Sequence, residues 1–565
     1  MDKRFFLALV LTALVVIVTP MIFRPVPAVR DTLRTDSSGV TPPVPETTTA
    51  QPPVAAAPAA VVGDQVPARG DSAPPAPAVL AETTTVSTPL ATYALSNLGA
   101  AVVSAELERY ASLRPSTGER NVSLLREGDR LFRLRLLTAR DTLAMDTIPF
   151  TVTEARSPEG SSMLRFDGRS GELSIELVYT FEPNSYVVHV AGSIQGFTPP
   201  ALLLIDLPAG LRSEEADTLA DQRMLAYVYK PLVRDASSIT FDDLEPGERQ
   251  VVPGALSWVA AKTKYFLVGV LAPDEGQAFG EFVAIGGPRT TRVATEARGT
   301  IVRPLSDGSF AFEVYAGPQE WRRLRALGRD FENVNPYGWS FLQGIIQPFA
   351  TIVMRILLWM RDTLQINYGW ILVIFGVGVR LLLWPLNQRA MRSSLRMQQI
   401  QPELMEIQKR YAGSQPEKYR EEVMKVYKAH GMSPLSPLLG CVPMLIPMPI
   451  FIALFFVFQN TIEFRGVEFL WLPDISLKDP LYVLPLLMGA SMFLLSWIGM
   501  RSAPPNPQTK LLTYVMPVMF TAFLINFAAG LNLYYFIQNL AALPQQWLIA
   551  RERSRAAPAR AVKPA

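Results

Sequence analysis

The chain has 565 residues, of which 49% are hydrophobic and 18% charged, so its composition is more apolar than that of most proteins that fold in water. Its net charge of +3 is too small to indicate nucleic-acid binding, and its single cysteine, Cys441, excludes a disulfide framework and a metal site built from several cysteines. The two histidines, His189 and His430, lie far apart, and no zinc-protease, serine-hydrolase or phosphate-loop motif occurs, so the sequence predicts no enzyme and no cofactor.

Residues 1–23 predict a transmembrane anchor. An apolar run from Phe5 to Phe23 follows Lys3 and Arg4, and basic residues before such a run favour a cytoplasmic N-terminus. A cleaved signal peptide is the alternative, although Val26-Pro27-Ala28 would be a poor cleavage site. The run is long for a signal peptide, which favours an anchor that is not cleaved.

Residues 24–90 predict a disordered tether. They contain thirteen prolines among Ala, Thr, Val and Ser, and no aromatic residue occurs between Phe23 and Tyr93. Such a segment cannot bury enough apolar surface to fold, so we expect a semi-extended linker.

Residues 91–333 have the character of a folded β domain. Polar and apolar residues alternate over 172–177 and 186–190, and turn signals separate such runs. We expect one large antiparallel β-sandwich, exported across the membrane and closed by a short helix from Trp321 to Asn333. His189 is most simply a strand residue of this sandwich.

Residues 338–362 predict an amphipathic helix in the membrane interface. Apolar side chains recur there at helical spacing, and Gln343, Gln347, Thr351 and Arg355 recur every four residues on the opposite face. If this segment crossed the membrane, the loop that follows the next helix would lie outside. That loop carries nine Lys or Arg against five Asp or Glu, which places it in the cytoplasm.

Residues 368–386 predict a membrane-spanning helix with one embedded cation, Arg380. Nineteen residues at about 1.5 Å each reach roughly 28 Å, close to the thickness of the hydrocarbon layer. An arginine inside a membrane is a candidate functional site because it must find water or a partner. The alternative is that its long side chain reaches the near interface, since Leu386 ends the span six residues later.

Residues 387–433 predict a cytoplasmic helical hairpin. The first helix continues past Pro402 towards Tyr411, and Ser414 with Glu417 forms a capping box for a second helix that ends near His430. We expect His430 to cap that helix or to lie on the surface. Methionines give the hairpin an adaptable apolar face, which fits either an ordinary hairpin core or a docking surface for varied partners.

Four apolar spans are expected within 441–549, at about 441–459, 481–500, 511–527 and 531–549. The acidic loop 460–480 suits the outside, while the basic tail 550–565 suits the cytoplasm. The sequence therefore predicts a multi-pass α-helical membrane protein with six transmembrane helices, a large exported all-β domain, and both termini in the cytoplasm.

Polar side chains are rare in these spans and are therefore informative. With Arg380 they could line one wet cavity, or each could simply form hydrogen bonds between helices. A channel or solute transporter is a weaker alternative, because no acid pairs with Arg380 within the spans and no inverted repeat is apparent. The residues in question, with Arg380, are Gln459, Asn526, Tyr534, Tyr535, Gln538 and Asn539.

Several stretches closely resemble the YidC/Oxa/Alb family of membrane protein insertases. They are GCVPMLIPMPIFIALFFVF (440–458), RLLLWPL (380–386), FLWLPDIS (469–476) and GLNLYYFIQN (530–539). The tethered exported domain is similar to that of Gram-negative YidC proteins. The likeness is specific over 368–549 and weak over 24–330.

The resemblance implies a membrane protein insertase and folding chaperone of the bacterial inner membrane, with a five-helix core and with residues 24–337 in the periplasm. In such proteins an arginine matching Arg380 attracts acidic residues of a client from a polar groove. Implied partners are nascent membrane proteins, the Sec translocon, and ribosomes or targeting factors that contact 387–433 and the basic tail. Gly376 stands where some relatives have a hydroxyl residue. Gln538 stands where a serine often precedes the asparagine of the sixth span.

The resemblance also implies an apolar slide on the third and fifth spans, along which the client segment moves into lipid. The matching residues are Met444, Ile450, Phe451, Leu454, Phe520 and Phe523. A membrane-anchored sugar-binding receptor remains a further alternative, because the exported domain is similar to sugar-binding folds.

Overall fold

The computed structural model describes residues 81–115, 118, 120–139, 141–158, 160–289, 291–335, 337, 342–411, 415–430, 447–501 and 507–556. The predicted anchor 1–23, nearly all of the tether 24–90 and most of the basic tail 550–565 lie outside these residues. The first residues of the third predicted span, among them Met444, lie outside them as well.

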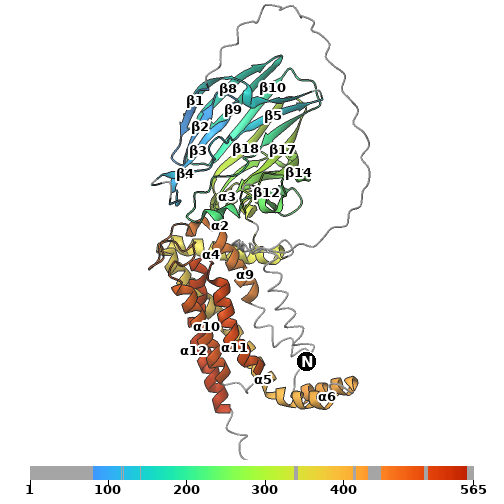
Figure 1. Cartoon of the computed structure of the whole chain (residues 1–565), viewed down its shortest axis with the longest axis vertical. Helices are drawn as coiled ribbons and strands as arrows, with labels where there is room; N and C mark the ends of the chain where they lie inside the picture. The colour runs from blue at the N-terminus through green and yellow to red at the C-terminus, as the bar shows by residue number, and fades with distance from the viewer. Residues whose placement is uncertain are drawn as a thin grey trace, which may run out of the picture. The chain divides into compact units, whose positions relative to one another are not determined.

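The N-terminal half of the described chain is an antiparallel β domain of two sheets, as predicted (Figure 1). The smaller sheet has the order β1-β2-β3-β4, formed by β1 (Thr83–Ser87), β2 (Ala91–Ser96), β3 (Val102–Ala111) and β4 (Asn121–Ser123).

The larger sheet has 14 strands, and its main path runs β6-β5-β11-β17-β16-β14-β15-β18-β10-β9-β8-β7, with β12 and β13 attached beside β14. These strands are β5 (Arg133–Thr138), β6 (Thr142–Ala144), β7 (Phe150–Arg156), β8 (Ser162–Ser170), β9 (Leu173–Phe181), β10 (Val187–Gln195), β11 (Ala201–Asp206), β12 (Ala226–Pro231), β13 (Ser237–Thr240), β14 (Arg249–Lys262), β15 (Phe266–Leu271), β16 (Phe279–Gly286), β17 (Ala297–Leu305) and β18 (Ser309–Pro318).

Strand β1 corrects the predicted end of the tether. Residues 83–87 pair with β2 along their whole length, from Thr83 with Ser96 to Ser87 with Thr92. The segment TTTVS is rich in β-branched residues, which fit a pleated strand, and Val86 is buried. Its proline-rich surroundings masked this local preference.

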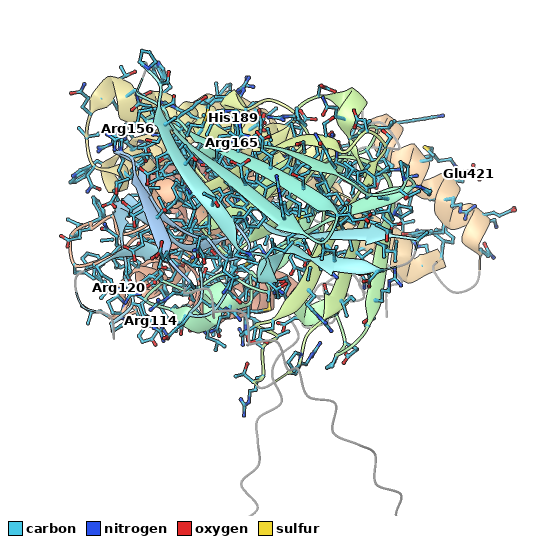
Figure 2. The ribbon with its side chains drawn as sticks, turned by 90° about the horizontal axis from the view of Figure 1, so that it is seen from above. Arg114, Arg120, Arg156, Arg165, His189 and Glu421 are labelled. Carbon is cyan, nitrogen blue, oxygen red and sulfur yellow. The ribbon has the colours of Figure 1, made fainter. Side chains whose placement is uncertain are left out.

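The alternation that predicted the β domain sets its core. In β9, Ile175, Leu177, Tyr179 and Phe181 are buried, and the residues between them are less so. His189 is a strand residue, as predicted: it lies half-exposed on β10 with its Nε2 3.2 Å from an oxygen of Glu182. Figure 2 labels it with Arg165 of β8.

The closing helix is interrupted, which the prediction of one helix from Trp321 to Asn333 did not include. Helix α3 (Trp321–Ala326) and the 3-10 turn η4 (Phe331–Val334) are separated at Gly328, Arg329 and Asp330. All three have positive φ, between 55° and 68°, a conformation that ends a helix. The Arg329 carbonyl accepts a hydrogen bond from the indole of the buried Trp258, at 3.0 Å, and so the interruption is tied to the β core.

Helix α4 (Gln343–Leu364) has the polar face that the sequence predicts, and that face contacts the β domain. Gln347 accepts a hydrogen bond from the backbone of Tyr337 and donates one to Asn333, and Arg355 lies over the ring of Trp321. A second face packs on α9, and a third exposes apolar side chains such as Trp359. By length and composition alone, α4 is also long enough to cross a membrane.

The remaining helices form the C-terminal helical region, in which Figure 1 shows α10, α11 and α12 side by side. They are α5 (Tyr368–Tyr411), α6 (Pro416–Ala429), α9 (Pro447–Asn460), α10 (Val483–Arg501), α11 (Pro507–Leu524) and α12 (Ala529–Ala556). Among the described residues, Tyr368–Gln388 and Val483–Met500 are, with α4, long and apolar enough to span a membrane. Shorter apolar segments lie at Ile450–Asn460 and Thr513–Leu524.

The hairpin differs from its prediction at one cap. Helix α6 begins with Pro416 at its first position after the N-cap Gln415, and Ser414, the predicted cap, lies outside the described residues. His430 does cap the helix end: its ring Nδ1 lies 3.0 Å from the Val426 carbonyl. Met405 and Met424 are exposed on the hairpin, which is the arrangement a docking surface needs.

Candidate functional site

Arg380 lies on α5, half-buried, and its guanidinium contacts α12. Its Nη2 donates a hydrogen bond of 3.0 Å to Oε1 of Gln545, a side chain that is only 2% exposed. The amide of Gln545 in turn donates to the carbonyl of Trp384, at 3.2 Å, one turn further along α5. The Nε of Arg380 is buried and has no partner among the described residues. The cation is therefore held from one side and keeps unused hydrogen-bonding capacity.

A second polar contact joins the same two helices one turn earlier. The side-chain amide of Gln538 donates to the carbonyl of Gly376 and to the hydroxyl of Tyr534, both at 2.9 Å. A Cβ at position 376 would lie 3.1 Å from Ile537, so a glycine there lets α12 approach closely. Gly376 has no hydroxyl side chain at this position, and its backbone carbonyl is the polar partner of Gln538 instead.

These contacts form a polar row, which we define as Arg380, Tyr534, Gln538 and Gln545. On α12 its members are spaced by four and seven residues, so they share one face of the helix. Gly376 pairs with Gln538 and Arg380 with Gln545, hence α5 and α12 run parallel. Contacts of Ser491 and Gly499 with Asn539 and Gln546 make α10 parallel to α12 as well.

Helices α9 and α11 run in the opposite direction. Phe451 and Phe455 of α9 contact Tyr535 and Phe527 in reverse order along the chain. In α11, Thr521 lies next to Gly489 and Tyr514 packs on Phe493. These directions are the ones required if α5, α9, α10, α11 and α12 are five consecutive crossings.

Tyr535 and the predicted slide residues form the apolar side of the region. Tyr535 is buried and stacks on Phe451, with ring centroids 4.4 Å apart, and its hydroxyl has no partner among the described residues. Ile450, which precedes Phe451 on α9, is half-buried, whereas Leu454 is fully buried in the helical core. On α11, Phe520 is half-buried and Phe523 is exposed. The exposed and half-buried members can meet a client segment without a conformational change, and Leu454 cannot.

Asn539 lies apart from the polar row. Its amide donates to Ser491 Oγ at 3.1 Å and approaches the Met488 carbonyl at 3.4 Å, both on α10. Asn539 follows Gln538 directly, and consecutive residues of a helix point about 100° apart. The structure therefore gives Asn539 the role of an interhelical hydrogen-bond donor, one of the two alternatives that the sequence left open.

Gln459 and Asn526 also lie apart from the polar row. Helix α11 ends at Leu524, so Asn526 sits in the turn before α12 rather than inside a span. Both residues line a cavity of about 170 Å³ together with Glu215 and Lys264 of the β domain. The structure brings them to each other but not to Arg380.

An ion pair beside this cavity joins the β domain to the loop after α9. Arg465 Nε lies 2.8 and 2.9 Å from the two carboxylate oxygens of Glu215, and each side chain is 5% exposed. The Arg465 guanidinium also lies over the Phe266 ring. Burial raises the pKa of Glu215 to about 7, and Arg465 opposes that shift.

The same loop holds Glu463, a carboxyl group whose ionised form is disfavoured by its surroundings. Burial raises the pKa of Glu463 to about 7, nearby Glu320 adds to the shift, and its Oε2 has no hydrogen-bond partner among the described residues. Between about pH 4.5 and 7 the folded protein holds a proton here that the unfolded chain releases, so this group's contribution to stability falls as pH rises.

We expect Glu463→Gln to stabilise the protein by up to about 3 kcal/mol at pH 8 and by less than about 1 kcal/mol at pH 5. Thermal unfolding in detergent at both pH values measures this difference. Glu468→Gln, which changes an exposed carboxylate of the same loop, is the control. A stabilisation of equal size at pH 5 and pH 8 would contradict the assignment to ionisation.

Gln545 is the functional candidate that the sequence reasoning missed. It lies beyond the recognisable GLNLYYFIQN stretch and next to Gln546, in a segment that reads as the polar end of a span. Its signal was the seven-residue spacing from Gln538, which puts both amides on the face of α12 that carries Tyr534.

Family models match both parts of the chain. Residues 359–556 match the family of the 60Kd inner membrane protein, and residues 83–352 match the YidC periplasmic domain. A crystal structure of an active YidC insertase with its first transmembrane domain resolved aligns with 82% of this chain and 92% of its own. Its TM-score is 0.33 and its sequence identity 20%.

Full-length relatives match along most of their length. The membrane protein insertase YidC of Anaeromyxobacter sp. (strain Fw109-5) is 31% identical over 405 residues, covering 70% of this chain and 71% of the relative. The YidC of Bordetella petrii is 30% identical over 495 residues, covering 85% and 84%. The chain therefore belongs to the YidC family of membrane protein insertases: it is a membrane protein with a periplasmic β domain and acts as an insertase rather than as an enzyme.

Proposed function

We propose that the protein moves client transmembrane segments from the cytoplasm into the inner membrane through a polar groove that contains Arg380 and the rest of the polar row. The observation that carries this proposal is the state of Arg380. It is a permanent cation on a proposed span, and among the described residues its side chain has one acceptor, Gln545, while its Nε is buried without one. An acidic group of a client would supply the missing acceptor.

The groove lowers the cost of moving a polar client tail through the membrane. A polar segment in hydrocarbon loses its hydration, at a cost of several kcal/mol per unsatisfied group. Groups such as Gln538 and Gln545 keep part of the path polar, and the charge of Arg380 attracts client carboxylates. Burial of the client's apolar segment, at about 25 cal/mol per Å², then favours its release into lipid.

The helix directions support the proposed topology. Loop charges predict that the second, fourth and sixth of six spans run from the periplasm to the cytoplasm, and α5, α10 and α12 are mutually parallel. In this arrangement α4 lies in the periplasmic interface, with its polar face on the β domain and its exposed apolar residues in lipid.

The cytoplasmic hairpin is the proposed receiving surface for clients. Its exposed methionines suit apolar segments of varied sequence, and its basic residues suit ribosomes or targeting factors. We propose that the protein inserts some clients alone and others beside the Sec translocon. Phe451, Phe520 and Phe523, which are half-buried or exposed, would then guide the apolar client segment towards lipid.

Depletion of the protein in its host tests the proposal. We expect small client proteins with one or two spans to remain accessible to protease on the cytoplasmic side after depletion, and a plasmid copy of the chain to restore their insertion. Normal insertion of all such clients after complete depletion would overturn the proposal.

A further inference from the structure

The β domain contains a polar cavity that the insertase function does not use. Its volume is about 550 Å³, within the range of small-molecule sites. It lies over β5, β11, β17 and β16, four strands that are neighbours in the larger sheet. The loop at 128–130 and the segment 207–209 complete its wall.

Strand register explains why polar side chains gather there. Arg133 pairs with Asp206 and Asp206 with Thr300, so the three share one face of the sheet. Arg135 and Arg298 lie two residues from members of this row and share the same face. The intervening residues, such as Leu134, Ile205 and Ile301, point to the opposite face and are buried in the core.

Two arginines that line this face of the sheet each form an ion pair with an aspartate, so their charges are already neutralised. Arg135 contacts both carboxylate oxygens of Asp206, at 2.9 and 2.6 Å, and Asp206 also accepts a hydrogen bond from Thr300. Arg133 lies 3.0 Å from Asp146. These pairs need no ligand, and they fix the floor of the cavity in a defined geometry.

Three further charged residues line the cavity and have side-chain hydrogen-bond donors or acceptors without a partner among the described residues. Arg298 is exposed; its backbone pairs with Ile285 in the sheet, and its side chain has no hydrogen-bond or ion-pair partner among the described residues. Within the part of the chain that the structure describes, the Arg130 side chain donates one hydrogen bond, to the Leu98 carbonyl, and a guanidinium has five N–H donors. Asp129 Oδ2 is buried without a hydrogen-bond partner among the described residues. Burial raises the pKa of Asp129, in keeping with an acceptor that lacks a donor.

We propose that this cavity binds a small hydroxylated anion, whose acidic group contacts Arg130 and Arg298 and whose hydroxyl group donates to Asp129. The four arginines and three aspartates of the lining leave one positive charge in excess, which favours an anionic ligand. Guanidinium groups bind carboxylate and phosphate through paired hydrogen bonds. An anion without hydroxyl groups would leave Asp129 unsatisfied, so the site should prefer sugar acids or phosphorylated polyols.

Calorimetric titration of the full chain in detergent tests the proposal with glucuronate and glycerol 3-phosphate as probes. Glucose and acetate are the controls that lack the acidic group or the hydroxyl groups. We expect saturable binding of at least one probe, with a Kd between about 10 μM and 1 mM, and at least tenfold weaker binding of both controls. Preference for glucuronate points to a sugar acid, and preference for glycerol 3-phosphate points to a lipid headgroup or a free phosphate ester.

Two matched variants decide whether the cavity is the site. Arg298→Gln should weaken probe binding at least tenfold, because it removes an exposed charge with no structural partner. Arg165→Gln, on β8 and labelled in Figure 2, should leave binding unchanged, since its ion pairs with Asp167 and Glu176 lie outside the cavity. No saturable binding of either probe up to about 10 mM, or equal binding by the two variants, would overturn the proposal.

Discussion

Arg380→Ala is expected to reduce insertion of clients with acidic periplasmic tails by about ten- to a hundredfold, and Arg380→Lys is expected to retain more activity. A hydrogen bond to a charged group contributes about 1.5–3 kcal/mol, and each 1.4 kcal/mol corresponds to a factor of ten. Lysine keeps the charge but loses the planar group that reaches Gln545, so it replaces the attraction only in part. Insertion into vesicles that contain the purified protein, followed by protease protection, measures the effect.

The dependence on client charge separates this role from a structural one. For a client whose tail acids are replaced by amides, wild type and Arg380→Ala should differ by much less than for the acidic client. A fold defect would instead reduce both clients equally. Full and equal activity of the alanine and lysine variants would favour the alternative in which Arg380 merely extends its charge to the interface.

Gln545→Glu is the second expected large effect. The new carboxylate would lie 3.0 Å from the Arg380 guanidinium, where Gln545 Oε1 now accepts its hydrogen bond. A permanent internal ion pair would neutralise the cation that attracts clients, because the pair sits in a half-buried site with little screening. We expect insertion of acidic clients to fall to nearly the level of Arg380→Ala, with the protein still folded.

The neighbouring glutamine provides a matched control for this prediction. Gln546→Glu adds the same charge one residue away, but Gln546 lies next to Gly499 of α10 and not next to Arg380. It should reduce insertion much less than Gln545→Glu. Gln545→Leu should have an intermediate effect, because Arg380 keeps its charge and loses its support. If Gln545→Glu retained wild-type discrimination between acidic and neutral tails, Gln545 would not control the charge of this site.

Much of the architecture was predictable because it depends on local patterns. Alternation in residues 172–177 identified strand β9, and the same pattern determines which of its side chains are buried. The end of α6 at His430 followed from helix-termination signals. Arg380 was identifiable because a cation within an apolar run is costly wherever the helix packs.

The partners of each polar side chain were less predictable. Gln538 and Asn539 are adjacent, yet the first contacts α5 and the second contacts α10. Both carry the same amide group, so residue type does not distinguish their roles. The rotation of α12 about its axis determines which helix each side chain contacts. Asn526 reads as part of an apolar span, but the helix ends two residues earlier and the side chain faces the β domain.

The sequence by itself determined that a β domain precedes a helical region with apolar candidate spans, and that one of these helices carries a cation, because periodicity and composition act over a few residues. Only the tertiary structure decided which groups share a site. It assembled the polar row from α5 and α12, more than 150 residues apart, and revealed Gln545 as the acceptor for Arg380. It also brought the separated arginines of the β domain to one cavity. Contacts of this kind depend on helix rotation and strand register, and no local pattern encodes either one.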